Sequence, residues 1–156
     1  MKTSAGVIPF RINRDGEMEF FVGHPGGKYN ERKDVWFFLK GGVEANETHA
    51  DAALREFKEE TSLTMEDCPS EMLIPLGVVS QSSHKTVVAY GLHYPNIDPF
   101  ECQSNYCEDG FTREIDRYQW MTYDRLRPLT HPSHLVFYKE LLKMYEETKQ
   151  EAKHAD

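Results

Sequence analysis

Three glutamates, Glu56, Glu59 and Glu60, have the spacing that places carboxylates on one side of a helix. Since a helix turns about 100° per residue, the three side chains would fall within an arc of about 100°. Each like-charge pair at such spacing is unfavourable by roughly 0.2 to 0.5 kcal/mol when nothing neutralises it. A bound divalent cation would reverse that sign, and Mg²⁺ or Mn²⁺ suits hard oxygen ligands. The pattern thus permits a metal site, although an ordinary solvated acidic face has the same spacing.

The helix that would carry these carboxylates is predicted over residues 48–61. Thr48 begins it, and Asp51 follows three residues later in an acidic variant of the capping box. Apolar residues gather on another side of this helix, where they can pack against a core: Ala50, Leu54 and Phe57. One face of the helix is therefore predicted to pack and another to concentrate negative charge.

Short strands are predicted around this helix from apolar runs bounded by turn residues. They cover residues 5–10, 19–22, 35–39, 73–80, 86–94 and 114–121, and Lys40-Gly41-Gly42 is predicted to break the third of them. A second amphipathic helix should follow residues 131–133, with core residues at helical spacing: Leu135, Tyr138, Leu142 and Tyr145. The polar tail from about residue 147 to residue 156 is expected to fray.

The chain has 156 residues, of which 39% are hydrophobic and 28% are charged, and this composition fits one ordinary globular domain. Its formal net charge of −8 argues against long nucleic acid as a partner, because non-specific affinity for nucleic acid comes from clustered Lys and Arg. An acidic enzyme can still bind a small polyphosphate when divalent cations lie between its carboxylates and the phosphates. Small phosphorylated molecules therefore remain possible substrates.

The three cysteines, Cys68, Cys102 and Cys107, are an odd number in a chain large enough to fold without disulfides, so reduced thiols are expected. Zinc binding is disfavoured, because no second Cys or His pair has a finger-like spacing. Residues 1–16 show no cleavage pattern, and no apolar run reaches about 18 residues. These features predict a cytoplasmic protein that does not bind membranes.

Residues 41–63 resemble the signature of the Nudix family. That signature is Gly, five residues, Glu, seven residues, Arg-Glu, an apolar residue, any residue, Glu-Glu, any residue, Gly and an apolar residue. The positions in register are Gly41, Glu47, Arg55, Glu56, Phe57, Glu59, Glu60 and Leu63. Ser62 departs from the signature, because the family has glycine there, and glycine would ease a left-handed backbone at the helix exit.

Segments outside the signature look like a small bacterial-type branch of the family, similar to nucleoside triphosphate pyrophosphohydrolases: His24-Pro25-Gly26-Gly27, Val35-Trp36, and Glu114-Ile115-Asp116-Arg117 with Trp120. The resemblance implies an α/β fold, a Nudix-type α/β/α sandwich with a mixed β-sheet. It also implies hydrolysis of the diphosphate linkage in a nucleoside diphosphate joined to another group, such as a nucleoside triphosphate, a dinucleoside polyphosphate or an ADP-ribose-like substrate. A homodimer is compatible with it.

The resemblance further implies ligands for Mg²⁺, or for Mn²⁺: the carbonyl of Gly41 and the carboxylates of Glu56, Glu59 and Glu60. Glu47 and Arg55 would organise the loop and the helix, although a plain surface ion pair would use the same two residues. The bound cation would polarise phosphoryl oxygens and lower the pKa of water for attack on phosphorus.

The reaction also needs a general base, for which the resemblance offers Glu56 and Glu114. Glu114 could instead pair with Arg113 or Arg117 on a solvated surface, where such a pair contributes no more than about 1 kcal/mol. Lys40 could contact phosphate, or it could be an ordinary turn residue. These alternatives stay open from the sequence.

Aromatic side chains that could stack on a nucleobase are present, but most aromatics at strand positions belong to the core. The candidates are Trp36, Phe38, Tyr90, Tyr94, Phe111 and Trp120. Two other interpretations remain for the whole chain: a catalytically silent Nudix fold that senses nucleotides or binds proteins, and an unrelated α/β domain with a solvated acidic helix. The intact carboxylates argue against the first.

Overall fold

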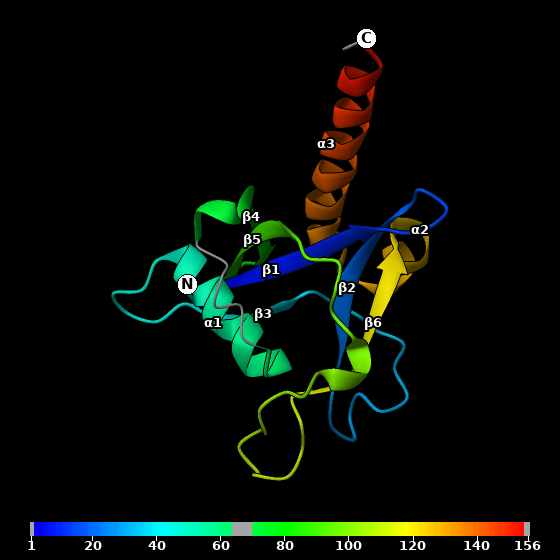
Figure 1. The fold of residues 1–156 in the computed structure, drawn as a ribbon. Helices are drawn as coiled ribbons and strands as arrows, with labels where there is room; N and C mark the ends of the chain where they lie inside the picture. Colours follow the sequence, from blue (N-terminus) through cyan, green and yellow to red (C-terminus); the bar gives the residue numbers. More distant parts are fainter. Residues whose placement is uncertain (1, 64–69, 155–156) are drawn as a thin grey trace.

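A six-stranded mixed β-sheet forms the centre of the molecule in a computed structural model that describes residues 2–63 and 70–154 (Figure 1). Its strands are β1 (Lys2–Ile12), β2 (Met18–Pro25), β3 (Leu39–Gly42), β4 (Ile74–Ser82), β5 (Lys85–His93) and β6 (Ile115–Thr122). They lie in the order β4-β5-β1-β2-β6, and β3 pairs with β1. β1 and β5 run parallel, whereas the other paired strands are antiparallel. The predicted mixed sheet is confirmed.

Helices cover both faces of this sheet (Figure 1). They are α1 (His49–Thr61), α2 (Tyr123–Leu126) and α3 (Leu135–His154), with short 3-10 turns at Ser70–Met72, Pro99–Glu101, Arg127–Leu129 and Pro132–His134. Phe57 of α1 packs in one core cluster, and Phe137 and Leu141 of α3 pack in the other. The predicted α/β/α sandwich is confirmed.

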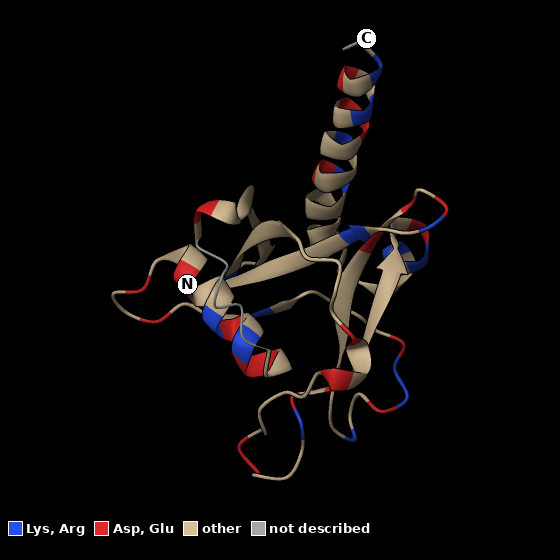
Figure 2. Cartoon of the chain, viewed as in Figure 1, with Lys and Arg blue, Asp and Glu red and all other residues tan. Residues whose placement is uncertain are grey.

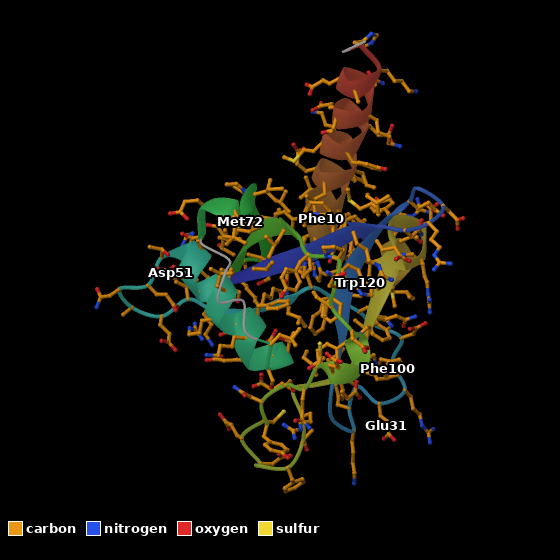
Figure 3. The ribbon with its side chains drawn as sticks, viewed as in Figure 1. Phe10, Glu31, Asp51, Met72, Phe100 and Trp120 are labelled. Atoms are coloured by element: carbon orange, nitrogen blue, oxygen red, sulfur yellow. The ribbon has the colours of Figure 1, made fainter. Side chains whose placement is uncertain are left out.

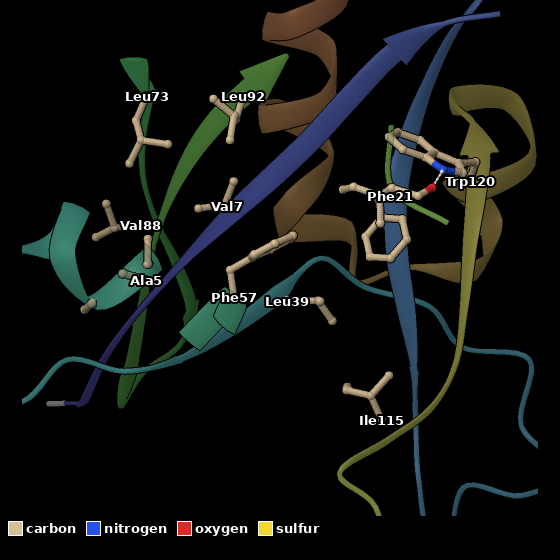
Figure 4. Packing of buried hydrophobic residues seen from close by; sticks show 13 residues of the cluster. Ala5, Val7, Phe21, Leu39, Phe57, Leu73, Val88, Leu92, Ile115 and Trp120 are labelled. Carbon is tan, nitrogen blue, oxygen red and sulfur yellow. Dashed lines mark hydrogen bonds between the residues drawn. The ribbon is translucent and has the colours of Figure 1, made fainter. Parts of the chain in front are cut away.

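The strand β1 is buried on both faces, which explains its continuous apolar run. Val7 belongs to the cluster under α1 and Ile8 to the cluster under α3, because successive residues of a strand point to opposite faces. Figure 4 shows the first cluster, in which the indole of Trp120 donates to the carbonyl of Ile97 at 3.0 Å. Phe57 anchors α1 among these side chains.

The strand predicted over residues 35–39 is displaced in the structure. β3 begins at Leu39, where that prediction ended, and it includes the Lys40-Gly41-Gly42 segment that was predicted to break it. Phe37 makes only an isolated bridge, to Gly23. Gly6 explains the shift, because a Cβ on Gly6 would overlap the backbone of β3. A close approach of two backbones therefore selects the register.

Both predicted ends of α1 are confirmed. The hydroxyl of Thr48 accepts the N–H of Asp51 at 3.1 Å. At the other end Ser62 adopts the left-handed conformation that glycine would favour, with φ 63°, and its N–H donates to the carbonyl of Lys58 at 2.8 Å. The Ser62 hydroxyl also donates to the carbonyl of Gln103. Serine thus takes the place of glycine and ties the helix end to a later loop.

The tail departs from the prediction of a frayed segment, because α3 stays helical to His154 and projects from the body of the molecule (Figure 1). Lys149 pairs with Glu146 at 3.0 Å, and the hydroxyl of Thr148 donates to the carbonyl of Met144 at 2.9 Å. Good helix formers and oppositely charged pairs one turn apart explain why this polar segment remains helical. None of the described helices is long and apolar enough to cross a membrane.

Candidate active site

The acidic residues of α1 lie against the edge strand β3, and acidic and basic residues alternate along this part of α1 (Figure 2). The carboxyl group of Glu56 occupies the space where a side chain on Gly41 would begin, so a Cβ there would overlap the carboxyl carbon and both oxygens. The Glu56 side chain is accordingly only 12% exposed. Glycine at position 41 is what allows this carboxylate to reach the backbone of β3.

Arg55 joins the carboxylates of α1 to the preceding loop. Its Nε and Nη2 donate to the two oxygens of Glu47 at 2.7 and 3.0 Å. Its Nη1 donates to Glu56 at 2.9 Å and to both oxygens of Glu59 at 3.3 Å. Nη2 also reaches the carbonyl of Gly42 at 2.8 Å. Paired, charge-assisted bonds of this kind fix orientation, so Arg55 holds three carboxylates and one strand carbonyl in place.

These contacts drive the pKa values of neighbouring carboxyl groups apart. The hydrogen bond from Arg55 lowers the pKa of Glu47 to about 2, so this carboxylate stays ionised. Burial raises the pKa of Glu56, although the hydrogen bond from Arg55 acts in the opposite direction. The hydrogen bond with Glu47 in turn raises the pKa of Arg55. Glu47 and Arg55 therefore form a permanent ion pair beside a less acidic Glu56.

Glu60 is the most buried member of the cluster, at 7% exposure. Among residues 2–63 and 70–154 its Oε2 has no hydrogen-bond partner. Burial, followed by the charges of Glu56 and Glu114, raises the pKa of Glu60 to about 9, and Lys40 opposes this shift. Tyr118 donates its hydroxyl to the carbonyl of Glu60, which fixes the last turn of α1 against β6. A buried carboxyl without a partner is costly unless it is neutral or meets a cation.

The loop before β6 brings Glu114 to the same cluster. The N–H of Asn105 donates to the carbonyl of Glu59 at 3.0 Å, and the carbonyl of Asn105 accepts the N–H of Glu114 at 3.0 Å. The charge of Glu114 helps to raise the pKa values of Glu56 and Glu60. Burial, and then the charge of Glu59, raises the pKa of Glu114 itself. One residue outside the signature thus joins the acidic cluster.

The two arginines that could have paired with Glu114 have other contacts. The guanidinium of Arg113 lies 3.8 Å from the ring centre of Tyr106, and Nε of Arg117 lies 3.7 Å from Asp116. In the part of the chain that the structure describes, neither arginine forms an ion pair with Glu114. The interpretation of Glu114 as half of a surface ion pair is therefore not supported by the geometry.

The donor set of this cluster fits a hard divalent cation. All its donors are oxygens, Oε2 of Glu60 lacks a partner, and Gly41 lets Glu56 approach β3. Within the described ranges, no three Asp, Glu, His or Cys side chains are gathered closely enough to enclose an ion as they stand. Arg55 explains this, because its Nη1 holds Glu56 and Glu59.

Two lysines come together beside the opposite face of β3. Burial, followed by the positive charge of Lys85, lowers the pKa of Lys40 to about 8, and the charge of Glu60 opposes this shift. Lys85 also lines a cleft of about 940 Å³ with Lys2 and Gly42. Lys85 was not among the site residues predicted from the sequence. Its place beside Lys2 depends on the parallel pairing of β1 with β5, which no local sequence pattern indicates.

Most of the aromatic candidates for base stacking lie in the core. Trp36, Phe38 and Trp120 are buried, and Tyr90 and Tyr94 pack against the cluster under α1. Phe111 is different, because it is 79% exposed on the loop that carries Glu114. Phe100 is also exposed and lies on the side of the molecule away from the end of α3 (Figure 3).

The described cysteines take no part in this cluster. Cys102 and Cys107 are free, as predicted, and burial raises the pKa of Cys102 to about 12, which keeps its thiol protonated. Cys68 lies outside the described residues. The chemistry of the site therefore depends on its carboxylates and lysines.

A family model described as the NUDIX domain matches residues 2–141. The chain belongs to the Nudix family. This confirms the family predicted from residues 41–63 and the prediction of a Nudix hydrolase. No curated protein sequence matches the chain.

Solved structures of other Nudix proteins share the fold. A C. elegans Ap4A hydrolase binary complex has 19% identity and a TM-score of 0.62, over 92% of this chain and 98% of that one. The E. coli dihydroneopterin triphosphate pyrophosphohydrolase has 19% identity and a TM-score of 0.61, over 90% and 95%. The Nudix domain of Shewanella oneidensis NrtR, complexed with ADP ribose, has 13% identity and a TM-score of 0.62, over 90% and 87%. Identities this low establish a common fold alone.

Proposed function

We propose that the chain is a Mg²⁺- or Mn²⁺-dependent hydrolase that cleaves the diphosphate linkage of a nucleoside diphosphate joined to another group. Nucleoside triphosphates, dinucleoside polyphosphates and ADP-ribose-like molecules belong to this class. The observation that carries the proposal is the acidic cluster of α1 beside β3, in which Glu60 keeps a buried oxygen without a partner among the described residues. The names of two structural neighbours, an Ap4A hydrolase and a dihydroneopterin triphosphate pyrophosphohydrolase, agree with it. We expect the enzyme in the cytoplasm, and size-exclusion chromatography would test for a homodimer.

The cation would be held by the carbonyl of Gly41 and the carboxylates of Glu56, Glu59 and Glu60. When bound, a divalent cation neutralises charge on phosphoryl oxygens and makes a water molecule more acidic. Arg55 donates hydrogen bonds to Glu56 and Glu59, and Glu47 anchors Arg55 through its paired hydrogen bonds. In this proposal Glu60 supplies an oxygen without a partner, and the Arg55–Glu47 pair positions the carboxylates of Glu56 and Glu59.

A general base must accept the proton of the attacking water, and Glu114 and Glu56 are the candidates. Both carboxyl groups have raised pKa values, which makes each a stronger base than an ordinary glutamate. Glu56 already accepts a hydrogen bond from Arg55, which weakens its basicity. Glu114 has no such arginine contact in the described part of the chain, so we propose Glu114 as the base.

A nucleotide-binding module without catalysis is the second candidate. One observation favours it, since Nη1 of Arg55 occupies oxygens of both Glu56 and Glu59. The neighbouring Nudix domain of NrtR was solved with ADP ribose, which shows that the fold can hold such a molecule. Binding without turnover would identify this role.

The test is a substrate panel assayed for release of nucleoside monophosphate together with the second product of each cleavage, which is pyrophosphate for ATP and ribose 5-phosphate for ADP-ribose. ATP, a dinucleoside tetraphosphate and ADP-ribose would be incubated with Mg²⁺, with Mn²⁺ and with excess chelator. Hydrolysis of at least one substrate that disappears in chelator supports the proposal. If every substrate binds and none is cleaved with either cation, the binding-module interpretation replaces it.

A further inference from the structure

A basic cleft borders the acidic cluster and has no assigned role in the reaction described above. It has a volume of about 940 Å³ and is lined by Lys2, Ser4, Gly42, His49 and Lys85, among others. β1 and β5 run parallel here, so Lys2 and Lys85 are partners in the sheet. In a chain with a formal net charge of −8, this concentration of lysines is a local exception.

The lysines at this cleft lack the counterions that surface lysines can often find. Lys2 and Lys85 are partners in neighbouring strands and both line the cleft, so their positive charges lie close together and repel. Lys85 is only partly exposed, so water screens this repulsion incompletely. Within residues 2–63 and 70–154, neither Lys2 nor Lys85 forms an ion pair with a carboxylate. An anion between the two ammonium groups would convert repulsion into attraction.

Gly42 connects this cleft to the carboxylates of α1. Its carbonyl accepts Nη2 of Arg55 at 2.8 Å, and the same residue lines the cleft. β3 is an edge strand beside β1, so no further strand separates its outer side from solvent. His49, the first residue of α1, also lines the cleft. Gly42 is therefore shared between the cleft and the arginine that holds the carboxylates of α1.

We propose that Lys85, with Lys2, binds a phosphate group of the substrate that is remote from the bond being cleaved. This inference rests on the proposed hydrolase function and narrows its substrate class. The enzyme selects nucleotides with three or more phosphates in a row, and ADP-ribose, with two, leaves the lysines without a partner. Free orthophosphate has the same chemistry as a phosphate group of the substrate, so the experiment must distinguish the two ligands.

The first measurement is binding, which does not depend on turnover. Inorganic tripolyphosphate is titrated by calorimetry, in excess chelator, into the parent protein, Lys85→Met and Lys139→Met. Methionine keeps the length of the side chain and removes its charge, and Lys139 is an exposed lysine of α3 that serves as the matched control. We expect Lys85→Met to bind at least about tenfold more weakly, a loss typical of one charge-assisted contact, and Lys139→Met to bind like the parent. Equal binding by all three proteins overturns the proposal.

Two further arms address folding and the source of the phosphate. Lys85→Arg keeps the charge, so it should bind tripolyphosphate within about threefold of the parent even if Lys85→Met is less stable. Loss of binding in Lys85→Arg as well would indicate a structural role and overturn the proposal. Orthophosphate should bind at least about tenfold more weakly than tripolyphosphate, because it contacts the lysines alone. Equal affinity for the two would assign the site to free phosphate instead of substrate.

The second measurement is specificity. The ratio of kcat/KM for ATP to kcat/KM for ADP-ribose should fall at least about tenfold in Lys85→Met. An unchanged ratio overturns the inference even if both substrates are hydrolysed. If the proposed hydrolase function is wrong, no substrate will be cleaved. The tripolyphosphate titrations would still test phosphate binding by the lysines in that case.

Discussion

The two faces of β3 carry clusters of opposite charge, and the two clusters are built differently. On the α1 side, Arg55 donates hydrogen bonds to Glu47, Glu56 and Glu59, and the buried Glu60 belongs to the same cluster. On the other side, Lys2 and Lys85 line a cleft, and no ion pair joins either to a carboxylate in the described part of the chain. The carboxylates of α1 are therefore held in place by Arg55, whereas the lysines of the cleft have no such partner in the described residues.

Burial acts on both clusters in the same direction, toward neutrality. It raises the pKa of Glu60 to about 9 and lowers that of Lys40 to about 8. Removing a charge from water always disfavours the charged form, whichever its sign. A bound cation would favour the ionised form of the carboxylates, and a bound phosphate would favour the ionised form of the lysines. Substitutions on each side of β3 can test this comparison.

The largest effect is expected from Glu60→Gln, which removes the ligand oxygen without changing the shape of the side chain. Turnover should fall about a thousandfold, because the cation loses one of its carboxylates. Thermal stability should change little, since the raised pKa of Glu60 makes this group largely neutral at pH 7 in the metal-free protein. Steady-state rates and thermal melts would be compared with Glu147→Gln on the exposed surface of α3. A near-parental rate for Glu60→Gln would point to the binding module.

The next largest effect is expected at Glu114, which lies outside α1 but whose charge raises the pKa values of Glu56 and Glu60. Glu114→Gln should lower turnover about a hundredfold, as expected for loss of a general base, with little change in the melting temperature. Glu108→Gln on the same loop is the matched control. A rate within about threefold of the parent would assign the base to Glu56 instead.

A smaller effect is expected when the internal counterion is weakened. Arg55→Lys keeps the charge but loses the paired hydrogen bonds to Glu47, so the concentration of Mg²⁺ needed for half-maximal rate should rise about tenfold. The pKa of Glu47 should also move up toward its ordinary value, which NMR titration can follow. The exposed Arg32→Lys serves as control. An unchanged requirement for Mg²⁺ would remove Arg55 from the organising role.

The smallest effect is a pH dependence on the basic side. Burial, with the charges of Lys40, His131 and Lys85, lowers the pKa of His134 from 6.5 to about 3. Between pH 3 and pH 6.5 the unfolded chain carries one more proton at His134 than the folded protein does. The contribution of His134 to the free energy of unfolding is therefore complete above pH 6.5 and is lost as the pH falls. From pH 7 to pH 5.5 this group should cost about 1 kcal/mol of unfolding free energy.

His134→Phe removes this proton and keeps a ring against Phe38. Urea unfolding at both pH values should therefore show a loss about 1 kcal/mol smaller in the variant than in the parent protein. Comparing two proteins is necessary, because the raised pKa values of Glu56 and Glu114 stabilise the fold as the pH falls and act in both. Identical losses would mean that His134 is not the responsible group.

The acidic side could be predicted from the sequence because its information is local. The capping by Thr48 and the spacing from Glu56 to Glu60 lie within one helix, and the structure confirms that helix. The left-handed turn at Ser62 was the open point, and a hydrogen bond to Gln103 accompanies it there. Residues close together in the chain thus determine most of this region.

The basic side could not be predicted because its information is long-range. β3 shifted from the predicted residues 35–39, since close packing against Gly6 decides its register. Lys85 lies beside Lys2 only because β5 pairs in parallel with β1. The tail of α3 is helical and not frayed as predicted, because its residues favour helix and form charged pairs one turn apart. Tertiary pairing, which no local pattern reports, brings these groups together.

The central claim is that the glutamates of α1 hold a cation that the reaction requires, and Mn²⁺ tests it most directly. Free Mn²⁺ would be counted by electron paramagnetic resonance while turnover is measured in the same samples, with Glu60→Gln alongside. We expect turnover to rise in proportion to bound Mn²⁺, to vanish in chelator, and Glu60→Gln to bind Mn²⁺ at least about tenfold more weakly. Full turnover in chelator, or parental Mn²⁺ binding by Glu60→Gln, would contradict the claim.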